Sequence, residues 1–234
     1  MNTSTPPVVY PDSDGLPLSV NTLQFEWIVT IHGNLDIAYL GDPNVFVAGD
    51  YLIYPVEGDA DVRQAPDVYV AFGRPKGHRG SYKVFAEEGV FPQVIFEVWS
   101  PGNRPVAMEE KRKFYEKYGA EEYYILYPEV PAYVQAWRAV NGKFEPVADL
   151  KTWRSPRLGI RFEVHRGHVT IYHVDGTRFL THAERAEAVE REKLQAVRER
   201  ARADQEQARA DEEKARADRL AEKLRKLGLD PDAE

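Results

Sequence analysis

Apolar residues recur at helical spacing in two segments of the chain. Over residues 22–32 they fall every three or four positions, after Asn21 and Gln24, which match a helix-capping box. This pattern predicts a helix from about Thr22 to His32 that ends at Gly33. The same spacing over Met108–Tyr118 predicts a second helix. Each helix should bury one apolar face.

Short apolar runs bounded by Gly, Pro or Asp predict strands between and after these helices. A hairpin turn is expected at Arg166-Gly167. The order is helix, three strands, helix and strand, followed by smaller strands, which indicates an α/β (α+β) domain. The predicted strands are Val45–Val56, Val68–Phe72, Val94–Trp99, Glu122–Tyr127, Tyr133–Val140, Phe144–Val147 and Arg161–His173.

The composition changes sharply after Thr181. Residues 183–226 are almost entirely Ala, Glu, Arg, Lys, Asp and Gln, and Ala-Arg-Ala-Asp recurs at 201, 208 and 215. Most of these residues are strong helix formers, so we expect one long exposed helix over 183–228 that ends at Gly228. The heptad repeat also permits a weak coiled coil, but four carboxylates at its seam positions (192, 199, 206 and 213) would repel each other on self-pairing. A single charged helix, a homo-oligomer and a protein partner all stay open.

Composition and charge narrow the class of protein. The chain is 43% hydrophobic, which is enough for a packed core, and it has no Cys, which excludes thiolate metal sites and a Cys nucleophile. We see neither a signal peptide nor an apolar run of membrane-spanning length, and therefore expect a soluble cytoplasmic protein with no membrane contact. The net charge of −7 divides into −5 in residues 1–182 and −2 in 183–234. Any contact with nucleic acid would therefore use a local basic patch.

Three carboxylates lie where burial is expected. Glu97 interrupts the apolar run Val94–Trp99, Asp67 opens the run Val68–Phe72, and Asp50 lies inside the first strand-like run. A lone ionised carboxylate in such a strand would cost several kcal/mol or would become protonated. These acids therefore need a partner.

Lys111 supplies a cation at the matching place on the second helix. It falls on the apolar face, three positions before Phe114 and four before Tyr115, whereas Lys113 falls on the polar face. Inward carboxylates and one inward ammonium can satisfy each other as a buried ion pair. They can equally form a site for a hard divalent cation such as Mg²⁺ or Mn²⁺, which prefers oxygen ligands.

The sequence resembles the Uma-two family of restriction-endonuclease-like proteins, within the PD-(D/E)XK nuclease superfamily. The match covers roughly residues 20–182. The lysine of the superfamily normally lies two residues after the second acid, where this chain has Trp99, and the family is similar in placing it on the next helix. The matching residues are Ala65-Pro66-Asp67-Val68, Phe96-Glu97-Val98-Trp99-Ser100-Pro101, Lys111, Tyr115, Gly119 and Glu122-Tyr123-Tyr124.

The resemblance implies a restriction-endonuclease-like core with a mixed central sheet flanked by helices. It implies that Asp67, Glu97 and Lys111 are catalytic. The metal would be held by Asp67, Glu97 and the backbone carbonyl of Val98, with Asp50 as an extra neighbour, and the substrate would be DNA, with RNA left open.

A basic stretch after the Asp67 strand is a second candidate for contact with nucleic acid. It could hold phosphates, or it could be an ordinary solvated loop. The candidate residues, together with one near the end of the Glu97 strand, are Arg74, Lys76, Arg79, Lys83 and Arg104.

These observations divide the chain into an irregular arm (1–20), a nuclease-like domain (21–182), a long charged helix (183–228) and a tail (229–234). Two functions stay open. One is a metal-dependent DNA endonuclease, and the other is a nuclease-fold module that binds DNA or proteins without cleavage.

Overall fold

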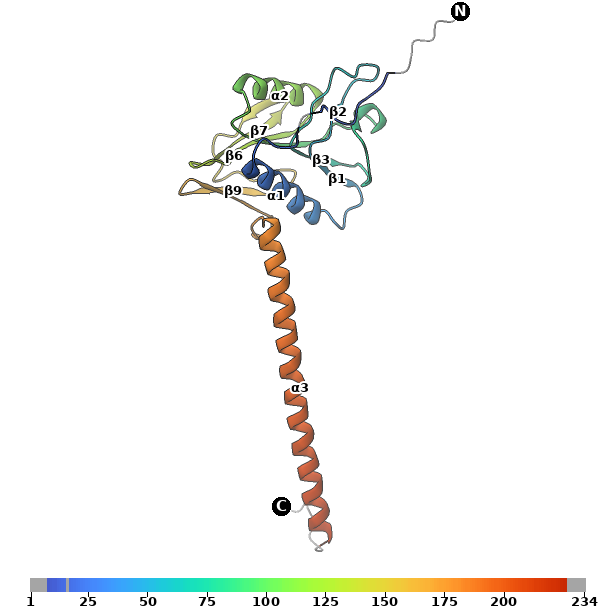
Figure 1. Ribbon diagram of the computed structural model, residues 1–234, viewed down its shortest axis with the longest axis vertical. Coiled ribbons are helices and arrows are strands. Elements are labelled where there is room, and N and C mark those ends of the chain that lie inside the picture. Colours follow the sequence, from blue (N-terminus) through green and yellow to red (C-terminus); the bar gives the residue numbers. More distant parts are fainter. Residues whose placement is uncertain (1–7, 16, 227–234) are drawn as a thin grey trace, which may run out of the picture. The chain divides into compact units, whose positions relative to one another are not determined.

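A computed structural model of the chain describes residues 8–15 and 17–226. The chain divides into two compact units, Met1–His182 and Ala183–Glu234. The first unit is built around a mixed sheet with helices on its faces, and the second contains most of one long helix (Figure 1). This mixed α/β architecture with a long C-terminal helix confirms the fold class predicted from the sequence.

The described residues contain the expected order of the longer elements, with two short elements at residues 82–83 and 84–86 that were not predicted. The helices are α1 (Thr22–Ala38), the 3-10 helix η1 (Val84–Ala86), α2 (Pro105–Tyr118) and α3 (His182–Lys226). The strands are β1 (Val45–Ala48), β2 (Ile53–Tyr54), β3 (Val68–Phe72), β4 (Tyr82–Lys83), β5 (Val94–Val98), β6 (Glu122–Tyr127), β7 (Tyr133–Val140), β8 (Lys143–Pro146), β9 (Arg161–His165) and β10 (His168–Tyr172).

The central sheet has six strands in the order β1-β3-β5-β6-β7-β8. Only β5 and β6 are parallel among its neighbouring pairs, and α2 is the crossover that joins them. Such a crossover is needed because parallel strands cannot be joined by a tight turn. Two small sheets, β9–β10 and β2–β4, complete the first unit.

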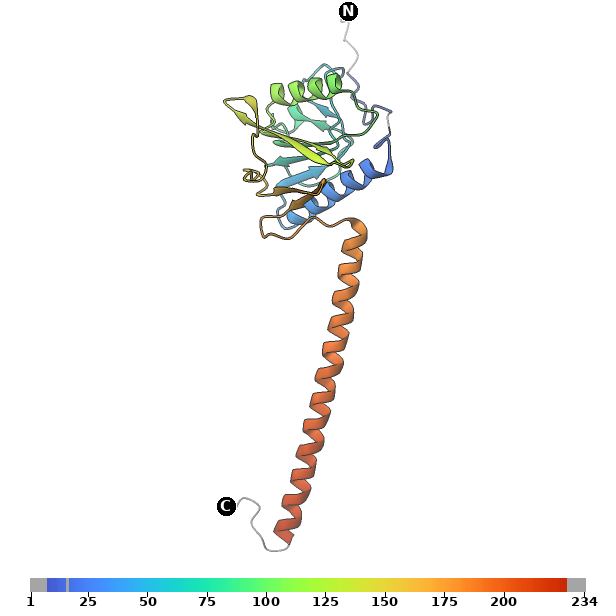
Figure 2. The same cartoon turned by 90° about the vertical axis from the view of Figure 1, so that its left-hand side faces the viewer.

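The helices α1 and α2 cover opposite faces of the central sheet, so the domain has two cores (Figure 2). Ile31 and Leu35 of α1 pack with Phe96 on one face, while Met108 and Tyr115 of α2 pack on the other. Side chains of a strand alternate between faces, so every strand in the middle of the sheet contributes to both cores. This explains why β3, β5 and β6 are apolar along nearly their whole length.

Several boundaries predicted from the sequence are confirmed. The strands β3, β6 and β7 span the predicted residues, and α2 ends at Gly119, whose φ of 103° gives the left-handed cap that favours glycine. The hairpin turn at Arg166-Gly167 joins β9 to β10.

Two local predictions were wrong. The first helix does not end at Gly33 but continues to Ala38, because Ile31, Asn34 and Leu35 maintain its buried face beyond the glycine. The run Val45–Val56 is not one strand: β1 ends at Ala48 and β2 begins at Ile53.

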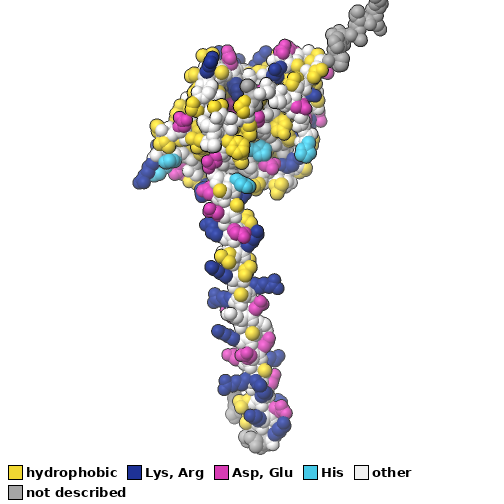
Figure 3. All heavy atoms as spheres, viewed as in Figure 1, with side chains coloured by type: hydrophobic (Ala, Val, Ile, Leu, Met, Phe, Trp, Pro, Cys, Tyr) yellow, Lys and Arg dark blue, Asp and Glu magenta, His cyan; other side chains and the backbone are white. Residues whose placement is uncertain are grey.

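The helix α3 has 45 residues, and none of those described is buried. Basic and acidic side chains follow one another along its surface, with apolar side chains, mostly Ala, between them (Figure 3). The predicted helical ending at Gly228 lies outside the described residues. No helix in the described part of the chain has the length and apolar character needed to span a membrane.

Candidate active site

The antiparallel pairing of β3 and β5 determines where the two predicted acids lie. Val68 lies opposite Phe96, so one further step of the same register places Asp67 opposite Glu97. Val68 and Phe96 belong to the core under α1. Because strand residues alternate between faces, Asp67 and Glu97 both face α2.

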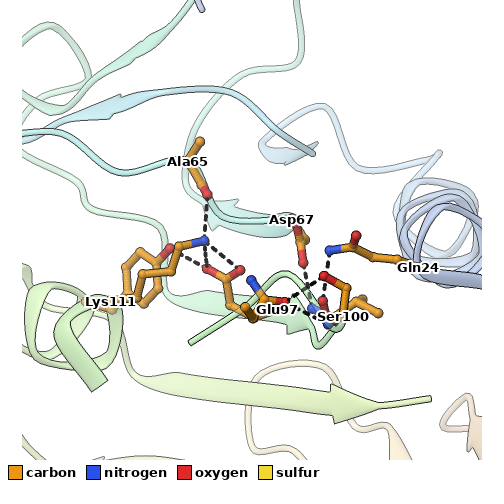
Figure 4. Close-up of polar contacts among 9 residues, drawn as sticks. Gln24, Ala65, Asp67, Glu97, Ser100 and Lys111 are labelled. Carbon is orange, nitrogen blue, oxygen red and sulfur yellow. Dashed lines mark hydrogen bonds and ion pairs between the residues drawn. The ribbon is translucent and has the colours of Figure 1, made fainter. Parts of the chain in front are cut away.

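Glu97 is almost fully buried, and two side chains of α2 satisfy its carboxylate. The Lys111 ammonium lies 2.9 Å from Oε1 and 2.9 Å from Oε2, and the Tyr115 hydroxyl donates to Oε1 at 2.6 Å (Figure 4). Burial and the charge of Glu97 raise the pKa of Tyr115 well above its usual value, so this phenol stays a donor. The two contacts fix the carboxylate in one orientation.

Lys111 points inward from α2. Its ammonium also donates to the carbonyl of Ala65 at 3.2 Å, two residues before Asp67. Burial lowers the pKa of Lys111, but the charges of Glu97 and Asp67 outweigh this effect and bring it above the usual value. Lys111 is therefore protonated at neutral pH. Lys113 instead points to solvent, with 68% of its side chain exposed and Glu109 at 3.7 Å.

Asp67 is buried without a cation of its own. Its Oδ2 accepts a hydrogen bond of 2.6 Å from the backbone N–H of Val98. Among the described residues, no basic side chain lies within ion-pair distance of its carboxylate. Burial, and after it the charge of Glu97, raise the pKa of Asp67 to about 8. A bound cation would relieve this unfavourable charge.

The carbonyl of Val98 is held by a residue that the sequence did not single out for the site. Gln24, at the start of α1, donates from Nε2 to the Val98 carbonyl at 3.0 Å, while its Oε1 accepts from the N–H of Val20 at 2.8 Å. Asn21 caps the helix as predicted, accepting from the N–H of Gln24 at 2.8 Å. From the sequence we predicted only a capping role for Gln24, because the Val98 carbonyl lies 74 residues away in the chain.

Asp50 lies in the turn between β1 and β2 and not inside a strand. It has a φ of 56° and donates its N–H to the carbonyl of Pro66 at 3.0 Å. The preceding Gly49 approaches the next strand so closely that a Cβ there would lie 2.7 Å from the backbone oxygen of Asp67. The predicted strand ends at Ala48, directly before this close approach, and Asp50 lies in the wall of the cavity beside Asp67. Burial and the nearby Asp14 raise the pKa of Asp50.

A cavity of about 280 Å³ adjoins the acids, with Asp14, Asp50, Asp67 and Lys111 in its wall. Residues 17–20 of the N-terminal arm line the same cavity. An earlier part of the arm is also bound to the domain, because the Tyr54 hydroxyl donates to the Pro11 carbonyl at 2.7 Å. Asp14 and residues 17–20 of the irregular arm predicted for residues 1–20 are therefore part of the cavity wall.

The donors around Asp67 fit a hard divalent cation. Carboxylate and carbonyl oxygens are the ligands that Mg²⁺ prefers, and Mg²⁺ is commonly held by one or two carboxylates together with water and substrate phosphate. In the described part of the chain no group of three or more acidic or histidine side chains converges on one point. A two-carboxylate site at Asp67 and Glu97 is therefore what this geometry can offer.

Comparisons with known proteins leave the family of the chain unassigned. No protein-family model and no curated protein matches the sequence. Among solved structures, the chain is similar to "a putative nuclease belonging to DUF820" from Anabaena variabilis ATCC 29413. The identity is 12%, the match covers 58% of this chain and 74% of the other, and the TM-score is 0.44. A likeness at this level carries no argument about residues or activity.

Four of the five residues predicted to bind phosphate contact acidic or aromatic side chains of the same domain. Arg74 pairs with Glu88 at 3.0 Å, and Lys76 lies 3.6 Å from Asp36. Arg79 binds both oxygens of Glu87 at 2.5 and 3.2 Å and stacks over the ring of Phe46. Lys83 lies over the ring of Tyr10. The basic stretch thus forms ion pairs with other segments of the domain. These acidic partners could not be predicted from the residues of the stretch itself.

Arg104 differs from the other predicted basic residues because it is exposed at the N-terminal end of α2. It begins the same helix that carries Lys111 seven residues later. No described residue forms an ion pair with its side chain, unlike Arg74, Lys76 and Arg79.

Proposed function

We propose that the domain is a metal-dependent endonuclease that hydrolyses DNA phosphodiester bonds. The main support for this proposal is the contact of Lys111 with Glu97, on the sheet face where Asp67 lies buried without a cation. The PD-(D/E)XK resemblance assigns catalytic roles to these three residues. Helical spacing independently selected Lys111 as the inward lysine, which supports the same assignment.

Asp67, Glu97 and the carbonyl of Val98 would hold Mg²⁺ or Mn²⁺, with Asp50 as an additional neighbour. When bound, the ion would supply an activated water and polarise the phosphodiester. Gln24 holds the Val98 carbonyl in place from α1.

Lys111 contributes a positive charge near the reacting phosphate. Because it is protonated and held in one position by Glu97, its ammonium can stabilise the additional negative charge that develops on the phosphoryl oxygens. Tyr115 orients Glu97 through its short hydrogen bond. Residues 17–20 of the arm and Lys111 line the same cavity.

The test is nicking of supercoiled plasmid by the full chain in Mg²⁺, in Mn²⁺ and in EDTA. Cleavage is expected with either ion and not with EDTA. Asp67→Asn keeps the side-chain volume and the acceptor for the Val98 N–H but removes the charge, and it should abolish cleavage. Activity that persists in EDTA or in Asp67→Asn would contradict the proposal.

A second candidate is a nuclease-fold module that binds a partner without cleavage. Three observations favour it: the acidic charge of residues 1–182, the engagement of the basic loop in ion pairs, and a long helix whose described residues are all unburied. The two candidates separate in one experiment, because a module without activity would leave plasmid intact in Mn²⁺ as well as in EDTA.

A further inference from the structure

A second cavity, of about 380 Å³, lies on the same sheet face as Glu97 and is walled by aromatic rings. Trp99, Tyr127, Tyr133 and Trp137 all line it. Its volume is within the range of sites that bind small organic molecules. Trp99 directly follows β5, Tyr127 ends β6, and Tyr133 and Trp137 belong to β7.

Three of these rings form a continuous stack across the sheet. The centroids of Trp99 and Tyr127 are 5.2 Å apart at an interplanar angle of 27°, and those of Tyr127 and Tyr133 are 4.1 Å apart at 9°. The register pairs Tyr127 with Tyr133, and one step beyond Val98 and Leu126 it pairs Trp99 with Tyr127. Tyr133 is 45% exposed, so a face of the stack is open to solvent.

The stack is directly beside the candidate active site. Glu97 lies opposite Ile125, which lies opposite Gln135, and this row is adjacent to the row of stacked rings. Glu97 and Trp99 are two positions apart on one strand, a separation of about 7 Å. Ile125 and Gln135 both line the aromatic cavity. The aromatic cavity therefore borders the row of residues that contains Glu97.

Polar side chains also line the cavity, and the Tyr127 hydroxyl donates to Gln135 Oε1 at 3.0 Å. Arg112 lies 5.9 Å from the centroid of Trp137 and is held by Glu109 through two hydrogen bonds of 2.7 and 2.8 Å. Both residues line the cavity with the amide of Gln135. Planar rings that stack, with a few donors and acceptors at the edge, are how proteins hold bases outside a duplex.

We propose that this cavity binds an unpaired nucleobase of the strand held at Glu97 and Lys111. The substrate class is then single-stranded or locally unpaired nucleic acid, because a base inside a duplex cannot reach a stacking position between side chains. This inference rests on the proposed nuclease function for the identity of the neighbouring phosphate. Stacking is insensitive to sequence, so little base preference is expected.

The test measures binding by the full chain in EDTA, where cleavage is excluded. Fluorescence anisotropy would follow a labelled 12-nucleotide oligo-dT, oligo-rU of the same length and a 12-base-pair DNA duplex. Both single strands should bind at least tenfold more tightly than the duplex. The ratio between oligo-dT and oligo-rU then identifies which nucleic acid the site prefers.

Tyr133→Leu should weaken single-strand binding by about tenfold or more and leave duplex binding unchanged. The matched control is Phe25→Leu, since Phe25 is 46% exposed but belongs to α1 on the other face. Trp99→Leu should weaken single-strand binding in the same way, because it removes the ring that stacks on Tyr127.

Equal affinity for single strands and duplex, or wild-type affinity in Tyr133→Leu, would overturn the proposal. The proposal would also be overturned if the protein bound none of the nucleic acids. It would likewise be overturned if the protein bound a Trp-containing peptide but not the oligonucleotides. The nuclease proposal fails separately: a chain that binds single strands through Tyr133 but cleaves neither plasmid nor oligo-dT in Mg²⁺ or Mn²⁺ retains this site and loses the catalytic function.

Discussion

The ammonium of Lys111 in α2 lies 2.9 Å from each carboxylate oxygen of Glu97 in β5, the strand that precedes this helix.

Lys111→Met removes this cation while keeping its aliphatic volume. Cleavage of plasmid should fall by about 10²-fold or more, by analogy with the removal of one charge-stabilising donor. Lys113→Met removes an exposed charge and should have almost no effect. Equal activity in Lys111→Met and the wild type would contradict the assignment.

The same pair should govern stability. Lys111→Met leaves a buried carboxylate without its cation, which costs roughly 3–5 kcal/mol. Adding Glu97→Gln removes the uncompensated charge, so the double variant should be more stable than Lys111→Met alone. Urea denaturation measures both differences and also identifies a temperature at which all variants are folded for the cleavage assay. A double variant less stable than the single one would show that the carboxylate was not left unpaired.

Asp67 should make the metal-free domain less stable as pH rises. Its folded pKa of about 8 lies above the ordinary value of 3.8, so the folded state binds the proton more tightly than the unfolded state. The stabilisation is complete below pH 4 and is lost as pH rises through about 8. In EDTA, Asp67→Asn should flatten this part of the pH profile relative to the wild type. Identical profiles of unfolding free energy for the two proteins would contradict the prediction.

Gly49 should be intolerant of even a methyl group. A Cβ there would lie 2.7 Å from the backbone oxygen of Asp67, so Gly49→Ala must displace a site strand and should cost roughly 1–3 kcal/mol. Gly33→Ala is the control, because nothing lies within 4 Å of a Cβ inside that helix. It should stabilise the domain by about 0.5–1 kcal/mol. Thermal and urea unfolding would compare the two, and an unaffected Gly49→Ala would refute the close approach.

Removal of α3 should leave a folded domain. None of the described residues of this helix is buried, so ending the chain after residue 182 exposes no core. We expect the truncated protein to retain a cooperative melt with little change in Tm, measured by circular dichroism. A truncated protein that is insoluble or melts without cooperativity would place the domain boundary elsewhere.

Local patterns predicted those features whose causes are local. The inward direction of Lys111 follows from its spacing to Phe114 and Tyr115, and the bounds of β3 and β6 follow from uninterrupted apolar runs. The order of elements was also readable, because each strand is bounded by residues that end strands.

The parts that the sequence did not reveal depend on contacts between distant residues. The break at Gly49 is caused by the backbone of Asp67, and the role of Gln24 depends on the Val98 carbonyl. The helix α1 passes Gly33 because Leu35 is buried against the sheet, which outweighs the weak helix preference of glycine. The acidic partners of the basic loop lie in other elements and could not be read from its own residues.

Successive side chains of β5 point to opposite faces of the sheet, so the number of residues in this strand affects both the core and the candidate active site. Phe96 belongs to the core under α1, while its neighbour Glu97 faces α2. One residue inserted between Val94 and Glu97 would exchange these faces, placing a carboxylate in hydrocarbon and a phenyl ring against Asp67. The length of β5 is therefore more constrained than its composition. In a mutagenic library selected for folded protein, substitutions at Trp99 should be recovered, whereas single-residue insertions within Val94–Val98 should be absent.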